Sequence, residues 1–166
     1  MMGSSFSSER RRVMKYKFTV HELARARRGA GNAALLAITT YDGKLYRLPI
    51  DLLEYLAIDE VRNGAIAPFS PFEQLARTFK LFQARLMSVT VADIYAGGYL
   101  ATVDLECFGR TGRTVFRAGT AIALALQFGT ETFINEEIVP RLCPVNYRGP
   151  IPFENMLAVN AARRLL

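Results

Sequence analysis

The side chains that could do chemistry in this chain are few and spread along it. Four carboxylates could converge on a divalent metal ion, namely Glu54, Asp93, Asp104 and Glu106. Oxygen ligands of this kind hold Mg²⁺ or Mn²⁺, which can activate water for hydrolysis. Asp93 fits a turn residue equally well, because a Gly-Gly turn follows it at residues 97–98. The carboxylates alone therefore leave a metal site and a purely structural role open.

Other reactive side chains form no recognisable motif. The single histidine, His21, lies in a basic segment and is more simply an incidental residue there. Cys107 and Cys143 lack the spacing of zinc ligands, and Cys107 fits a small buried residue of a strand. The chain has no phosphate-binding glycine loop and no nucleophile elbow. We therefore expect neither a bound metal nor a cofactor.

The positive charge of the chain is concentrated near its start. The net charge is +6, and residues 1–30 hold eight basic residues and two acidic ones. The remaining residues hold thirteen of each sign. The basic residues of this segment are Arg10, Arg11, Arg12, Lys15, Lys17, Arg25, Arg27 and Arg28. They predict an arm that contacts nucleic acid, an anionic membrane surface or an acidic protein, with a solvated tail as the alternative.

The first half of the chain predicts a hairpin followed by two helices. Two apolar runs are joined by "YDGK", which is typical of a type I′ turn. Asp51 and Glu54 then form a capping box, and Gly64 can end that helix. The next helix begins at Ser70 with proline in its first position. Its predicted apolar face contains Phe72, Leu75, Ala76, Phe79, Phe82 and Leu86.

The second half predicts three strands, a buried helix and a short strand. Alternate residues from Tyr99 to Cys107 are apolar, "GRTGR" predicts a turn and "TVFR" a strand. In "RAGTAIALALQF" we expect Thr120 to be the N-cap and Gly129 to end the helix. "TFIN" fits a strand and "EEIVPRL" a helical turn. The predicted core-facing residues of the helix are Ala121, Leu124, Ala125 and Phe128.

These elements predict an α+β fold. Hairpins alternate with helices, which favours a mainly antiparallel sheet with helices packed on it and suggests an internal structural repeat. We expect a basic arm at 1–32, one domain at 33–139, and a proline-rich extended arm with a terminal helix at 140–166. The apolar runs are too short to cross a bilayer and the start does not resemble a secretory signal. Two distant cysteines favour the cytoplasm or another reducing compartment.

The order of motifs resembles the bifunctional nuclease domain. The similarity runs over residues 33–139 and rests on "LPI", the Glu of "LEYLAI", the turn "DIYAGGY" and the stretch "RAGTAIALALQFGTETFINEEIV". Members of that family are named for cleaving both RNA and DNA. The resemblance implies the same fold here, and it makes Glu54, Asp93 and Arg117 the candidate catalytic residues, with Mg²⁺ or Mn²⁺ as cofactor if the chain is a nuclease.

This chain departs from the family at its most acidic positions. Where the family has Pro-Leu-Thr-His-Asp, this chain has "PFSPFE". Where it has Asp-x-Arg-Pro-Ser-Asp, residues 115–120 read "VFRAGT", so that only Arg117 is retained. Hydrolysis of a phosphodiester needs carboxylates for metal or a base for water, and these substitutions remove both from that segment.

Three functions remain open from the sequence. We expect a non-catalytic member of the fold that serves as a subunit or scaffold in a larger assembly, with protein partners bound through residues 1–30 and 140–166. The alternatives are a working nuclease, and a nucleic-acid-binding regulatory module without cleavage. Association of like copies and peripheral membrane contact also remain open.

Overall fold

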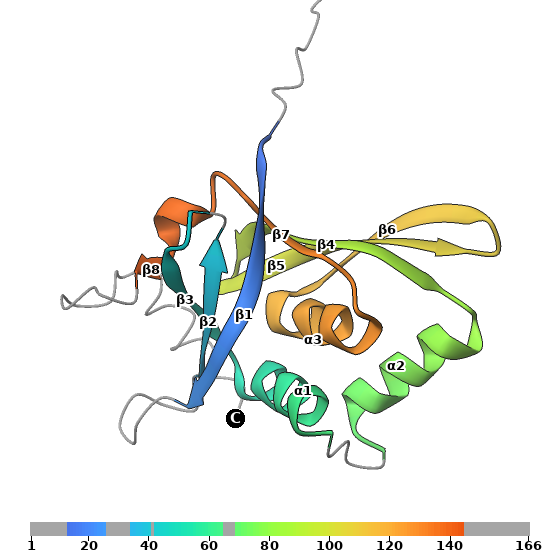
Figure 1. The fold of residues 1–166 in the computed structure, drawn as a ribbon. Helices are drawn as coiled ribbons and strands as arrows, with labels where there is room; N and C mark the ends of the chain where they lie inside the picture. Colours follow the sequence, from blue (N-terminus) through green and yellow to red (C-terminus); the bar gives the residue numbers. More distant parts are fainter. Residues whose placement is uncertain (1–12, 26–33, 41, 65–68, 145–166) are drawn as a thin grey trace, which may run out of the picture.

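The computed structural model describes residues 13–25, 34–40, 42–64 and 69–144. These residues form one mixed sheet with helices inside its curve (Figure 1). The strands are β1 (Lys15–Arg25), β2 (Ala34–Thr40), β3 (Leu45–Ile50), β4 (Arg85–Tyr95), β5 (Gly98–Cys107), β6 (Arg110–Arg117), β7 (Thr132–Asn135) and β8 (Cys143–Pro144). The helices are α1 (Leu52–Asn63), α2 (Pro71–Leu81), α3 (Ala118–Phe128) and the short 3₁₀ helix η1 (Val139–Arg141).

The predicted α+β class is confirmed, and the order of elements repeats. The strands lie in the order β6-β5-β4-β7-β1-β2-β3-β8, and every neighbouring pair is antiparallel except β4 and β7. The chain passes through three strands and then a helix twice, as β1-β2-β3-α1 and as β4-β5-β6-α3. The short strand β7 lies between β4 and β1 and so joins the two halves into one sheet.

Part of the predicted basic arm is an interior strand. Lys15–Arg25 form β1, which pairs with β2 on one side and β7 on the other. Tyr16, Phe18 and Val20 alternate with polar residues and pack against the core, because successive side chains of a strand point to opposite faces. The predicted boundary at residue 32 is therefore corrected, and the folded domain includes β1.

The core is built around α3. This helix is apolar on all sides, as expected of a buried helix, and Figure 1 shows it enclosed between the curved sheet and α1. Ala121, Leu124 and Ala125 are buried as predicted, and Phe128 is half-buried. The curl of the sheet brings β3 into contact with β5 although other strands separate them in the strand order.

The local signals of α1 and α2 are largely confirmed. Asp51 and Glu54 form the predicted capping box, and Gly64 ends α1 in the left-handed conformation. Ser70 caps α2, which has proline at its start as expected. The helix ends earlier than predicted, at Leu81, so that Phe82 is exposed outside it. The following residue of the predicted face, Leu86, is buried in β4 instead.

Two turns differ from the predicted ones. In the first hairpin only Gly43 has positive φ among the described turn residues, so the turn is not type I′. Its amide donates to the Thr40 carbonyl, as in the longer hairpin loops that end in a left-handed glycine. The β5–β6 turn lies at Phe108 and Gly109, which both have positive φ, and the predicted turn sequence "GRTGR" instead lies largely within β6.

The end of the predicted domain is also shifted. Beyond residue 139 the chain completes η1 and then pairs Cys143 and Pro144 with β3 as β8. The remainder of the predicted proline-rich arm and its terminal helix, 145–166, lies outside the described residues. In the described part of the chain, no helix has the length and apolar character needed to cross a membrane.

Candidate functional site at the helix N-termini

The start of α1 carries the first part of the candidate site. Asp51 is the N-cap, and its Oδ1 accepts the backbone N–H of Glu54 at 2.8 Å. In return Glu54 Oε2 accepts the backbone N–H of Asp51 at 2.8 Å. The reciprocal bonds satisfy two amides that have no partner within the helix. This local exchange fixes where the Glu54 carboxylate lies.

The same carboxylate caps the neighbouring helix α3. The predicted N-cap, Thr120, is wrong: α3 begins at Ala118, and the N-cap Arg117 makes no side-chain capping bond. Glu54 Oε1 instead accepts the backbone N–H of Gly119 at 2.8 Å. A Cβ on Gly119 would lie 2.5 Å from the Cβ of Glu54, so only glycine lets the two helices approach this closely. One buried side chain therefore serves two helix N-termini.

Arg117 closes the cluster from the end of β6. Its Nη2 lies 3.5 Å from Asp51 Oδ2, and its Nε lies 4.0 Å from Glu54 Oε2. The guanidinium lies against Gly98 of β5, where any Cβ would overlap it. Asp51 and Arg117 are the N-cap residues of α1 and α3, so the ion pair joins equivalent positions of the two structural repeats.

The environment of Glu54 disfavours its charge. Its side chain is buried, and burial together with the neighbouring charge of Asp51 raises the pKa of Glu54 from its ordinary 4.5 to about 7. The two backbone amides and the charge of Arg117 act in the opposite direction and keep the pKa from rising further. Near neutral pH this carboxyl group therefore exists in both protonation states.

Asp93, the third candidate, does not join this cluster. It is exposed on β4, and its carboxylate accepts the backbone N–H of Ile94 at 2.7 Å. It lies opposite Leu100, which lies opposite Arg117, so two strand spacings of about 5 Å each separate Asp93 from Arg117. The sequence resemblance grouped the three residues, and the fold brings together only Glu54 and Arg117.

The remaining carboxylates are engaged elsewhere. Asp104 accepts from Arg113 Nε at 2.6 Å and from the Ser88 hydroxyl at 2.9 Å. The bonds from Arg113 are the main cause that lowers the pKa of Asp104. Glu106 lies opposite Arg85 in the β4–β5 pair. Among the described residues, no group of three or more histidine, cysteine, aspartate and glutamate residues has the geometry to hold a metal ion.

The predicted basic contact residues fall into two sets. Lys15 and Lys17 lie on β1, where Lys15 donates to the Thr90 hydroxyl at 3.3 Å and Lys17 pairs with Glu131. Arg25 is the last residue of β1. The other five lie outside the described residues: Arg10, Arg11, Arg12, Arg27 and Arg28.

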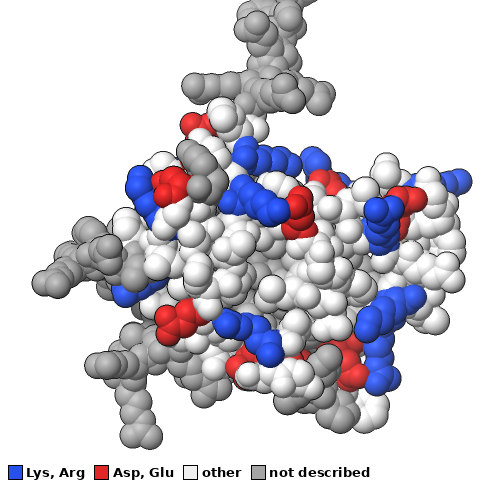
Figure 2. Space-filling model, viewed as in Figure 1, with Lys and Arg blue, Asp and Glu red and all other residues white. Residues whose placement is uncertain are grey.

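The described part of the chain is electrically balanced. It contains thirteen lysine and arginine residues and thirteen aspartate and glutamate residues. Figure 2 shows the two signs interspersed over one face, in place of a continuous positive field. The whole net charge of +6 therefore belongs to the segments outside the described residues.

The chemical capacity of the cluster follows from these contacts. Both oxygens of Glu54 accept backbone amides, and Arg117 compensates the charge of Asp51. This arrangement holds two helices together and leaves little of the Glu54 carboxylate accessible, since only 4% of the residue is exposed. No family model matches the chain, and no curated protein matches it significantly. The resemblance to the bifunctional nuclease domain therefore stays a prediction.

Proposed function

We propose that this protein is a non-catalytic member of the bifunctional-nuclease-like fold that acts as a binding subunit or scaffold in a larger assembly. The observation that carries the proposal is the use of Glu54. Its two oxygens accept the amides of Asp51 and Gly119, so this candidate catalytic carboxylate serves as a helix cap. A carboxylate that binds a catalytic metal ion must be open to the ion and to solvent, and only 4% of Glu54 is exposed.

Exposed apolar side chains support a binding role. Phe69, Leu81 and Phe108 are each more than three-quarters exposed. Leu81 and Phe108 lie on neighbouring segments, since Cys107 Sγ donates to the Phe82 carbonyl, and large apolar side chains that gather on a surface mark contact with another molecule. Fewer residues of the first arm are available for partner contacts than the sequence predicted, because residues 15–25 are part of the sheet. The proposal therefore assigns partner contacts to residues 1–12, 26–33 and 145–166 and to the folded surface.

A native complex provides the test. The full chain with an affinity tag is recovered from its own cells at low salt, treated with nucleases, and sized by multi-angle light scattering. We expect a discrete assembly containing a second protein in fixed ratio that survives the nucleases. Recovery of the chain only as a monomer, or only together with nucleic acid, would contradict the proposal and favour the nuclease or the nucleic-acid-binding module.

A further inference from the structure

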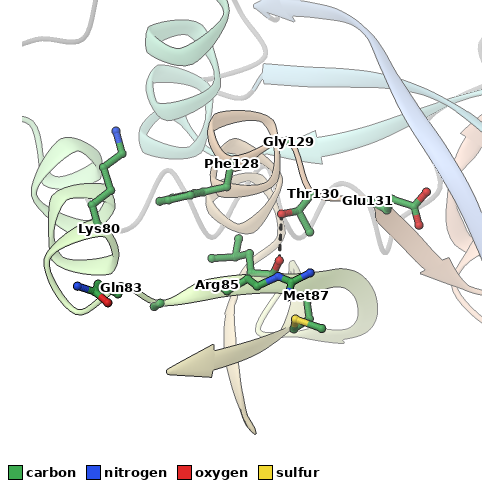
Figure 3. Close-up of a pocket in the computed structure, with 10 residues that line it drawn as sticks. Lys80, Gln83, Arg85, Met87, Phe128, Gly129, Thr130 and Glu131 are labelled. Carbon is green, nitrogen blue, oxygen red and sulfur yellow. Dashed lines mark hydrogen bonds between the residues drawn. The ribbon is translucent and has the colours of Figure 1, made fainter. Parts of the chain in front are cut away.

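A groove opens where the ends of two helices meet the start of β4. It encloses about 600 Å³ between the end of α2, residues 85–87 of β4 and the end of α3 (Figure 3). Thr130 is one of its lining residues, and its hydroxyl donates to the Leu86 carbonyl at 3.4 Å. This groove lies at the C-terminal end of α3, whereas the cluster around Glu54 lies at its N-terminal end, so the two are separate.

The groove has a mixed polar and apolar lining and an apolar rim. Phe128 lines it, and its ring is anchored against Phe79 with a centroid distance of 6.3 Å. Met87 is 46% exposed. It lies between Leu86 and Ser88, where the register of the β4–β5 pairing shifts. Next to the groove, Leu81 and Phe82 follow one another at the end of α2 with 78% and 51% of their surface exposed.

The rim extends onto the β5–β6 turn. Cys107 Sγ donates to the Phe82 carbonyl at 3.2 Å, which places the turn beside the end of α2. Phe108 follows in that turn and is 76% exposed. Covering side chains of this size removes apolar surface from water, so a partner that covers the rim would gain affinity from it.

The charge of the groove is positive. Lys80 and Arg85 line it, and neither forms an ion pair with any carboxylate of the described segments. The one acidic residue of the lining, Glu131, pairs with Lys17, and Figure 3 shows its carboxylate directed away from the two cations. An occupant therefore meets two uncompensated cations beside apolar side chains.

From this combination we infer that the groove binds an acidic segment of a partner protein that carries apolar anchor residues. The inference rests on the proposed function and names the chemistry of one partner contact. Nucleic acid fits less well, because its affinity depends on many phosphate contacts and the groove offers two cations. An anionic membrane fits less well because the described part of the chain has no net positive charge to hold it against anionic lipids.

A labelled peptide tests the inference on the full chain. The probe is a short fluorescein-labelled synthetic peptide of Glu, Asp, Leu and Phe, followed by fluorescence anisotropy. We expect saturable binding that weakens as salt rises. Lys80→Glu combined with Arg85→Glu should weaken it by about tenfold or more, and Met87→Ser should weaken it as well. The control, Lys44→Glu combined with Arg110→Glu, makes the same change in net charge on exposed sites outside the groove, at the loss of the ion pair of Lys44 with Asp42, and should leave binding unchanged.

Three competitors decide the kind of occupant. The competitors are a charge-reversed peptide of Lys, Arg, Leu and Phe, a single-stranded RNA, and vesicles of phosphatidylcholine with phosphatidylserine. Each should bind weakly, and equally to the unaltered protein and to the groove variants. Stronger binding of any of them, or equal binding of the acidic peptide by the groove variants and the control, would overturn the inference. Failure of the peptide experiment leaves the proposed function standing when an assembly is still isolated from cells. Absence of any assembly contradicts the proposed function instead.

Discussion

The surroundings of Glu54 act on its carboxyl group in opposite directions. Ionised, it is the better acceptor for the amides of Asp51 and Gly119, but burial and the charge of Asp51 favour the neutral form. Arg117 offsets part of this cost from a distance of 4.0 Å. A buried carboxyl group with a pKa of about 7 is often taken as a sign of catalysis. Here burial and the charge of Asp51 account for the raised pKa, and the two backbone hydrogen bonds give the carboxyl group a structural role.

The pH dependence of stability should report this group. The folded pKa of Glu54 lies above its ordinary value, so the folded chain binds more protons than the unfolded chain between about pH 4.5 and 7. The free energy of unfolding should therefore fall as pH rises through this window, by at most about 3 kcal/mol. Urea denaturation across this range measures the change, and Glu54→Gln should flatten it.

Asp104 gives an internal comparison for that experiment. Arg113 lowers the pKa of Asp104, so its contribution to stability is lost only as pH falls toward and below the ordinary value of 3.8. The two groups thus act in separate ranges of pH. An unchanged slope above pH 4.5 in Glu54→Gln would show that another group causes the dependence.

Gly98→Ala should shift the same window. The new methyl group would overlap the guanidinium of Arg117, and this flexible side chain can move away at small cost. Its charge lowers the pKa of Glu54, so its departure should raise that pKa further and move the fall in stability to higher pH. NMR titration of the Glu54 carboxyl carbon measures the shift. Gly112→Ala is the matched control, since its methyl group would meet only Leu105 at 3.8 Å, and an equal shift there would refute the explanation.

At the scale of elements, the cap of α3 comes from another helix. Thr120→Ala should therefore change the free energy of unfolding by less than about 0.5 kcal/mol, since no capping side chain is lost. Glu54→Ala should cost about 1–3 kcal/mol, because the buried amide of Gly119 loses its acceptor. Denaturation midpoints at about pH 7 measure both. A larger loss of stability in the Thr120 variant than in the Glu54 variant would show that Thr120 is the N-cap of α3 after all.

The sequence predicted correctly those helix ends that are determined by residues next to them in the chain. The caps at Asp51 and Ser70 and the glycines that end α1 and α3 follow from neighbouring residues alone. The start of α3 could not be predicted in this way, because its acceptor is 65 positions away in sequence. For β1 a signal was present: Tyr16, Phe18 and Val20 alternate with polar residues, but the surrounding basic residues favoured an arm.

The candidate site was predictable only in part. Glu54 and Arg117 were identified from the resemblance, and the fold places them 4.0 Å apart. The role of Asp51 beyond its own helix was missed, since its contact with Arg117 depends on how the two repeats pack. The groove beside α2 had no sequence signal, because its lining residues from α2, β4 and the end of α3 come together only in the folded chain.

At the scale of the whole molecule, the sheet depends on its first strand. β1 lies between β7 and β2, so its loss would separate the two halves of the sheet. Deletion of residues 1–12 should leave the circular dichroism spectrum and the cooperative unfolding intact, whereas deletion of residues 1–25 should abolish cooperative unfolding. If the protein without residues 1–25 folded normally, β1 would be dispensable for the fold, which would contradict this account.

Hydrolysis of nucleic acid tests the central claim most directly. Full-length protein is incubated with labelled single-stranded RNA and DNA in Mg²⁺ and in Mn²⁺, beside Glu54→Gln and Asp93→Asn. The account predicts no cleavage above the buffer background in any of the three, because the carboxylate of Glu54 is occupied by backbone amides and Asp93 lies apart from it. Strong metal-dependent cleavage by the unaltered protein that disappears in either variant would contradict it and identify the chain as a nuclease.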